Sequence, residues 1–205
     1  MILVAYVVGM FPTAQLVGRH EGLDPTAAGS GNPGATNVYR LAGWRAGAVV
    51  LAIDAAKGAI PTAVALAVLG RGWALGAAVA AVLGHIAPVV RRFHGGKGVA
   101  TAAGASAVLW PAAAVALTVV FVVVARLGRT ASVASLAIAA GLPVAVAVSG
   151  RPGREVAVAV LLAVLVVARH HANIRRLLHG EERAVGDPRP GPERRSPPDP
   201  RIPSP

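Results

Sequence analysis

The sequence has no cysteine, and only 14% of its 205 residues are charged. The absence of cysteine excludes a disulfide framework, a cysteine-based zinc site and a cysteine nucleophile. The low charge argues against an ordinary water-soluble domain, in which about a quarter of the residues are charged. Acidic residues are scarce, with 9 Asp and Glu against 20 Lys and Arg. With 55% hydrophobic residues, this composition predicts a membrane protein whose positive charge meets anionic lipid, and no nucleic-acid partner.

Charged residues fall into clusters, and the stretches between them are close to the roughly 20 residues that a helix needs to cross a bilayer. The first stretch lacks a basic start and a small-residue cleavage site, which favours a retained helix over a signal peptide. Pro111 divides the longest stretch into two helices because its ring breaks the hydrogen-bond ladder. We therefore predict an all-α, polytopic membrane protein with about seven transmembrane helices. They lie within residues 1–18, 46–70, 72–90, 98–125 (two helices), 130–150 and 156–168.

The basic residues predict the orientation of these helices. If the N-terminus is outside, 16 of the 20 Lys and Arg lie on the inner side and three lie outside. Because Lys and Arg are enriched on the cytoplasmic side, we expect the N-terminus outside and the C-terminus in the cytoplasm. Residues 1–182 are predicted to form the membrane domain. Residues 183–205 contain eight of the 16 prolines, which predicts a disordered cytoplasmic tail.

The first of three polar segments covers residues 29–40. Its glycine-rich first half is typical of a tight turn with free backbone amides, and a helix can begin at Ala35. On that helix Thr36 and Arg40 are four residues apart and share a face. Amides near a helix start and a guanidinium both favour oxyanions, so the segment predicts a site for an anionic polar ligand. The alternative is an ordinary Gly/Asn loop.

The second segment, residues 94–101, is rich in glycine and contains Lys97. Glycines allow the backbone to fold around a phosphate, and a lysine supplies a point charge. The segment is not a Walker A motif, because Arg91 and Gly98 occupy positions that require Gly and Ser or Thr. The alternative is a flexible basic loop.

The third segment, residues 169–182, follows the last predicted span. His170, Asn173 and Leu177 share one helix face by their spacing, whereas the adjacent His171 points elsewhere. This face has no carboxylate at ligand spacing, so we predict no metal site. The alternative is a basic helix end that anchors to lipid headgroups, which explains Asn173 poorly.

Two further polar features lie inside the predicted spans. Asp54 and Lys57 are three residues apart, which favours a structural ion pair over a proton relay. Ser132 and Ser135 fit either hydrogen bonds back to helix carbonyls or a place in the polar site.

Taken together, the three segments resemble one family, the bacterial acyl-phosphate-dependent glycerol-3-phosphate acyltransferases (the PlsY family). The resemblance covers roughly residues 9–182. It rests on Gly29-Ser30-Gly31-Asn32-x-Gly34-Ala35-Thr36-Asn37-x-x-Arg40, on Gly84-His85-x-x-Pro88 with Gly95-Gly96-Lys97-Gly98-Val99-Ala100-Thr101, and on His170-x-x-Asn173-Ile174-x-Arg176-Leu177 with Gly180 and Glu182.

The resemblance implies transfer of a fatty acyl group from acyl phosphate to the 1-hydroxyl of glycerol 3-phosphate, giving lysophosphatidic acid and inorganic phosphate without a cofactor. It also implies a multi-pass protein of the bacterial inner membrane, a cytoplasmic active site, contact with membrane lipids and functional coupling to the enzyme that produces acyl phosphate. By motif, the catalytic residues are Ser30, Arg40, Lys97, His170 and Asn173, the substrate-binding residues are Thr36, Asn37, Gly95, Gly96, Gly98 and Ser135, and Glu182 is structural.

Phosphate is a good leaving group, so this chemistry needs positioning and charge neutralisation more than a covalent step. We expect direct attack by the substrate hydroxyl, with either His170 or a substrate phosphate oxygen as the base. An acyl-CoA mechanism is disfavoured because no histidine is followed five residues later by Asp. The alternative function is a transporter of a small phosphate ester that uses Asp54 and Lys57 as its charged relay. The family pattern implies a basic residue near Thr26 and a lysine in place of His94. We expect these two departures to affect the affinity for substrate and not the activity itself.

Overall fold

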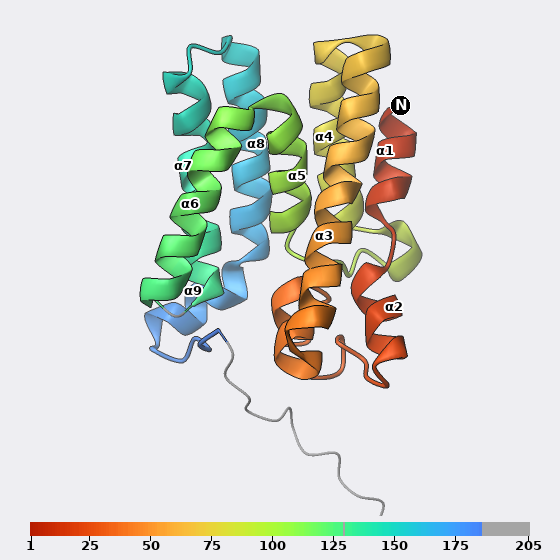
Figure 1. The fold of residues 1–205 in the computed structure, drawn as a ribbon, viewed down its shortest axis with the longest axis vertical. Coiled ribbons are helices and arrows are strands. Elements are labelled where there is room, and N and C mark those ends of the chain that lie inside the picture. Colours follow the sequence, from red (N-terminus) through yellow and green to blue (C-terminus); the bar gives the residue numbers. More distant parts are fainter. Residues whose placement is uncertain (129, 186–205) are drawn as a thin grey trace, which may run out of the picture.

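The computed structural model describes residues 1–128 and 130–185, and within these ranges the regular structure is entirely helical. Most helices run up and down along the long axis of one bundle, and the short helices α2 and α9 lie on opposite sides of its lower end (Figure 1). The helices are α1 (Ile2–Gly9), α2 (Thr13–His20), α3 (Ala35–Leu69), α4 (Arg71–Ile86), the 3-10 helix η1 (Val89–Arg91), α5 (Val99–Leu109), α6 (Pro111–Gly128), α7 (Ala131–Val148), α8 (Gly153–Arg169) and α9 (His171–Leu178).

The helix breaks confirm one prediction and correct two others. The break between α5 and α6 lies at Trp110, directly before Pro111, as predicted. The first predicted helix is divided into α1 and α2, because Pro12 lacks the N–H that would continue the ladder. The last predicted span begins earlier than expected, so Glu155 lies inside α8. In α3, Gly43 has φ 86° and ψ 178°, which separates a short polar helix from the long apolar one.

Small residues allow the helices to pack closely. A Cβ on Gly58 of α3 would overlap the carbonyl of Thr101 in α5, and a Cβ on Gly104 of α5 would overlap the backbone of Ala55. In a bilayer, helices gain little from burying apolar side chains, so close backbone contact is a main source of attraction. The result is a firm α3–α5 pair, with α4 packed against both helices. The second polar segment is attached to the start of α5.

A buried polar network holds the upper end of the bundle together. Arg71 at the start of α4 donates to both carboxylate oxygens of Glu155 and to the carbonyl of Leu109. The indole of Trp110 donates to the same carboxylate over 2.7 Å. The network joins α4, the α5–α6 break and α8. Sequence analysis did not pair these residues, because they are far apart in the chain.

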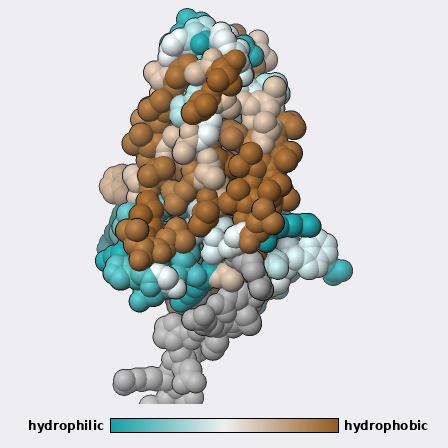
Figure 2. Space-filling model, turned by 90° about the vertical axis from the view of Figure 1, so that its left-hand side faces the viewer, coloured by the Kyte–Doolittle hydropathy of each residue, from teal (hydrophilic) through white to brown (hydrophobic). Residues whose placement is uncertain are grey.

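The outer surface has the pattern of a membrane protein. Figure 2 shows one face, on which apolar residues cover the middle and hydrophilic residues gather at the ends. Among the described residues, five helical stretches are long and apolar enough to cross a membrane, and the count is six if the pair α8–α9, bent by 60°, is taken as one span. Helix α5 has only 11 residues. The all-α, multi-pass architecture therefore agrees with the sequence.

Candidate active site

The three polar segments meet at one cavity of about 330 Å³ at the lower end of the bundle. Its described lining carries four Arg or Lys and two Asp or Glu side chains, so the cavity has a net positive character. Segments that are separated by more than a hundred residues therefore line the same cavity. The predicted site residues in the lining are Ser30, Thr36, Asn37, Arg40, Lys97, Gly98, Ser135, His170 and Asn173.

The first wall is a loop organised by Asn37, which is almost fully buried at the start of α3. Its side-chain oxygen accepts the N–H of Ser30 at 2.9 Å, and its amide donates to the carbonyls of Pro25 (2.9 Å) and Ala28 (3.1 Å). These three bonds replace the regular structure that the loop lacks. Asn37 thus shapes the loop that presents Ser30, and because it also lines the cavity, its predicted contact with substrate stays a prediction.

Arg40 reaches the cavity from the same short helix as Thr36, which confirms that the two residues share a face. Its guanidinium donates to the carbonyl oxygens of Arg183 (3.3 Å) and Ala184 (3.1 Å). These residues are the first of the predicted tail, and they lie against the site. The remainder of that tail, residues 186–205, lies outside the described residues.

The second wall begins at Lys97 and continues into the first turn of α5. Gly98 is in the left-handed region, with φ 81°, which turns the chain into the helix. Burial lowers the pKa of Lys97 to about 8, with Glu182 acting against this shift and the neighbouring guanidinium groups of Arg176 and Arg40 adding to it. A lysine beside a helix start with unpaired N–H groups suits a phosphate.

Gly95 and Gly96 are buried behind this wall and are not among the described residues that line the cavity. The N–H of Gly96 donates to the carbonyl of His85 at 3.1 Å, and a Cβ on Gly96 would overlap the His85 ring. The predicted contact of Gly95 and Gly96 with substrate therefore stays a prediction. Their small size allows the loop to pack against the end of α4.

The third wall is the bend between α8 and α9. His170 is 1% exposed, and its Nδ1 lies 2.7 Å from the carbonyl of Val166. In a neutral ring this contact places the proton on Nδ1 and leaves Nε2 as an acceptor. Asn173 is also buried, whereas His171 is exposed, as the helical spacing predicts. The bend at His170 interrupts the continuous helix that sequence analysis assumed.

Glu182 closes the third wall from the C-terminal side. Its carboxylate accepts from Asn173 Nδ2 at 2.7 Å and from Arg176 Nε at 2.8 Å. Burial raises the pKa of Glu182, but these hydrogen bonds outweigh that effect and hold the pKa below its usual value. Glu182 therefore stays ionised. Its two hydrogen bonds within the third wall support the structural role that the resemblance implies.

Asp54, one member of a residue pair inside a membrane-spanning helix, also lines the cavity. Lys57 Nζ lies 2.7 Å from Asp54 Oδ1, which confirms the predicted ion pair, and it also donates to the carbonyl of Phe11 at 2.9 Å. Asp54 and His85 both line the cavity. Sequence analysis did not place His85 in the site. Its position follows only from the packing of α4 against α3.

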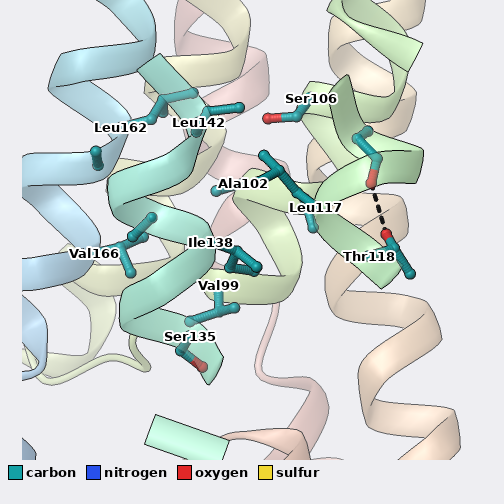
Figure 3. A pocket seen from close by; sticks show the side chains of 14 residues that line it. Val99, Ala102, Ser106, Leu117, Thr118, Ser135, Ile138, Leu142, Leu162 and Val166 are labelled. Carbon is teal, nitrogen blue, oxygen red and sulfur yellow. Dashed lines mark hydrogen bonds between the residues drawn. The ribbon is translucent and has the colours of Figure 1, made fainter. Parts of the chain in front are cut away.

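An apolar cleft of about 50 Å³ adjoins the polar cavity between α5, α6, α7 and α8 (Figure 3). The two spaces share the residues Val99, Ala103, Thr118, Ser135 and Ile138. Ser135 lies near the lower end of the cleft in Figure 3, and its hydroxyl donates to the carbonyl of Ala131 at 2.8 Å. Both predicted roles of Ser135 therefore hold: its hydroxyl bonds back to a helix carbonyl, and the residue lines the cavity.

Within residues 1–128 and 130–185, no group of three or more His, Asp and Glu side chains could hold a metal ion. The arrangement instead combines cations and amides at the polar end with apolar side chains at the other end. It can bind a phosphate beside an acyl chain.

Comparison with known sequences gives a consistent match. A family model described as glycerol-3-phosphate acyltransferase matches residues 1–180. A protein of that name from Shewanella sediminis is 46% identical over 187 residues, which cover 90% of this chain and 92% of the relative. The protein of the same name from Rubrobacter xylanophilus is 42% identical over 187 residues, covering 91% and 94%.

Two solved structures have the same fold. One is a crystal structure of PlsY (YgiH), an integral membrane glycerol 3-phosphate acyltransferase, in its glycerol 3-phosphate form. It is 34% identical with a TM-score of 0.86, over 89% of this chain and 92% of that one. The lysophosphatidic acid form gives a TM-score of 0.84 over the same shares.

Proposed function

This chain belongs to the glycerol-3-phosphate acyltransferase family, and from that premise we propose that it transfers a fatty acyl group from acyl phosphate to the 1-hydroxyl of glycerol 3-phosphate. The products are lysophosphatidic acid and inorganic phosphate. The observation that carries the proposal is the single cavity lined by Ser30, Arg40, Lys97, His170 and Asn173, which come from three distant segments.

Glycerol 3-phosphate binds through its phosphate to the second wall. Lys97 supplies the charge, and the N–H groups of Gly98 and the first turn of α5 supply hydrogen bonds along the favourable end of the helix dipole. Arg40 and Ser30, on the opposite wall, bind the phosphate of the acyl donor. Two separated cationic positions are what two phosphate-bearing substrates require.

The acyl chain of the donor enters the apolar cleft. The cleft adjoins the polar cavity at Ser135 and Ile138, so a carbonyl held there keeps its phosphate among the cations and its chain among apolar side chains. The 50 Å³ cleft is smaller than a long acyl chain, so the chain follows it outward between the helices to the lipid. This arrangement suits a donor that arrives from the bilayer.

The reaction needs no covalent intermediate on the enzyme. The 1-hydroxyl of glycerol 3-phosphate attacks the donor carbonyl, and its proton passes to Nε2 of His170 or to a substrate phosphate oxygen. The tetrahedral species then expels inorganic phosphate, and the new ester remains on the glycerol. Cations fixed around the cavity stabilise the negative charge that develops, without reorganisation during the step.

The same site supports the predicted membrane topology. Helix α5 rises about 16 Å, roughly half of a hydrocarbon core of about 30 Å, before α6 returns toward the end where α5 began. Counted as a short pass, α5 gives seven passes, with the N-terminus outside and the cavity in the cytoplasm. Water-soluble glycerol 3-phosphate and the basic residues of the lower end then lie on the same side.

A turnover assay in detergent tests the proposal. The purified protein receives glycerol 3-phosphate with acyl phosphate, acyl-CoA or acyl carrier protein as the donor, and lysophosphatidic acid is measured. We expect lysophosphatidic acid only when acyl phosphate is the donor. A small-phosphate transporter would form no product with any donor, because its function ends when the membrane is dissolved. The contacts of Lys57 with Asp54 and Phe11 favour the enzyme, since they fit a fixed pair rather than a moving relay.

A further inference from the structure

We propose that Arg169 is a positioning residue that fixes the glycine segment 95–98 relative to His170. This inference rests on the proposed function, in which that segment binds glycerol 3-phosphate. In the sequence, Arg169 contributes only to the count of basic residues on the inner side. In the structure it joins the second wall of the cavity to the third.

The contact is a two-point grip on successive carbonyl groups. Arg169 Nη2 donates to the carbonyl of Gly95 at 2.9 Å, and Nε donates to the carbonyl of Gly96 at 3.1 Å. A planar guanidinium presents parallel donors at a fixed separation, whereas a lysine ammonium is a single point charge. Arginine is therefore the side chain that can orient two peptide groups at once.

The grip determines the direction of the backbone N–H groups. In a trans peptide the C=O and N–H point in opposite directions, so Arg169 turns the N–H of Gly96 and Lys97 away from itself. The N–H of Gly96 accordingly meets the carbonyl of His85 at 3.1 Å. The segment is thus held from two sides immediately before the residue that carries the substrate charge.

Arg169 acts through other residues and does not belong to the reacting set. It is half-buried, and the described residues that line the cavity do not include it. His170 follows it directly in the chain and lines the cavity. Of these two consecutive residues, Arg169 therefore contacts the glycine segment and His170 contacts the cavity. This links the position of Lys97 to the position of His170.

The test compares Arg169→Ala and Arg169→Lys with Arg175→Ala, which removes an exposed arginine from the adjacent α9. Steady-state constants are measured in detergent, and hydrogen–deuterium exchange is followed over residues 92–99. In Arg169→Ala we expect the KM for glycerol 3-phosphate to rise about tenfold, the loss typical of a charge-assisted hydrogen bond, with a smaller change in kcat. Exchange at Gly96 should accelerate. The KM of Arg169→Lys should lie between the values of Arg169→Ala and the unmodified protein. Arg175→Ala should have the KM and the exchange of the unmodified protein.

Unchanged KM and unchanged exchange in Arg169→Ala would overturn the proposal, as would an equal loss in Arg175→Ala, which would indicate a general effect of charge near the membrane. If Arg169→Ala does not fold, Arg169→Lys decides: wild-type exchange and KM in that variant would refute the two-point grip. Failure of the proposed function is distinguishable, because the unmodified protein would then form no lysophosphatidic acid while the exchange comparison still reports on the loop.

Discussion

Asn173 and Glu182 are joined by a 2.7 Å hydrogen bond that closes the C-terminal segment onto the cavity. The same carboxylate accepts from Arg176, so one acidic side chain orients two residues of the third wall. Glu182 thus gives Asn173 a fixed direction next to His170. The two residues come from opposite ends of the third motif, and α9 brings them together.

Glu182→Gln should destabilise the protein by about 1–2 kcal/mol, because two hydrogen bonds lose their charged acceptor. Activity should fall with it, since Asn173 loses its fixed orientation. The melting temperature in detergent measures the first effect. Glu181→Gln is the matched control, because Glu181 is exposed one residue away. Equal melting temperatures for both variants would show that Glu182 does not hold the wall.

Arg40→Lys should lose most of the activity although it keeps the charge, because a lysine cannot present the planar fork that grips a phosphate. The value of kcat/KM with acyl phosphate as the varied substrate measures the effect. Arg45→Lys is the control, since Arg45 is exposed and lies over the ring of Trp44. Near wild-type rates for Arg40→Lys would restrict Arg40 to a role in topology.

His170→Ala should abolish acyl transfer, whereas His171→Ala should leave it largely intact. The first ring is buried in the cavity wall at the bend between α8 and α9, and the second is exposed on α9. Initial rates on folded, inserted protein are the measurement. Equal loss in the two variants would mean that the pair holds the last helix in place and that the base belongs to the substrate.

The KM for glycerol 3-phosphate should rise as the pH increases above about 8, because burial lowers the pKa of Lys97 to about 8. The lysine is charged below that pH and neutral above it, and only the charged form attracts a phosphate. The rise approaches about tenfold per pH unit if binding requires the charge. Lys97→Arg should flatten the profile, because arginine stays protonated. A constant KM between pH 7 and pH 9.5 in the unmodified protein would contradict this assignment.

Gly98→Ala should raise the KM for glycerol 3-phosphate more than it lowers kcat. The residue has φ 81°, and an added Cβ would lie 2.9 Å from Cγ2 of Ile86, so the turn into α5 must shift. Gly72→Ala provides the control, because a Cβ there meets nothing within 4 Å and its φ is not positive. Steady-state kinetics with both variants would detect the difference. An unchanged KM in Gly98→Ala would make the segment a linker.

The sequence by itself determined the class of fold and the chemical character of the site. Mostly apolar stretches of about 20 residues between basic clusters favour helices in a bilayer, because a helix satisfies all the backbone groups of such a stretch internally. Pro111 specified the α5–α6 break, and helical spacing separated His170 from His171. Ser30 and Lys97 stood out because glycine-rich segments with cations favour a phosphate ligand, but only the three segments taken together favoured that chemistry over ordinary loops.

Only the tertiary structure decided which residues touch the cavity and which support it. Asn37 lines the cavity and also bonds the loop backbone that presents Ser30, whereas Gly95 and Gly96 pack against the end of α4 behind the cavity wall. Arg169 resembles any basic residue at a membrane boundary until α8 places it against the glycine segment. The physical reason is that hydrogen-bond partners distant in the chain are selected by helix packing. The local periodicity that predicts a helix says nothing about what its side chains will meet.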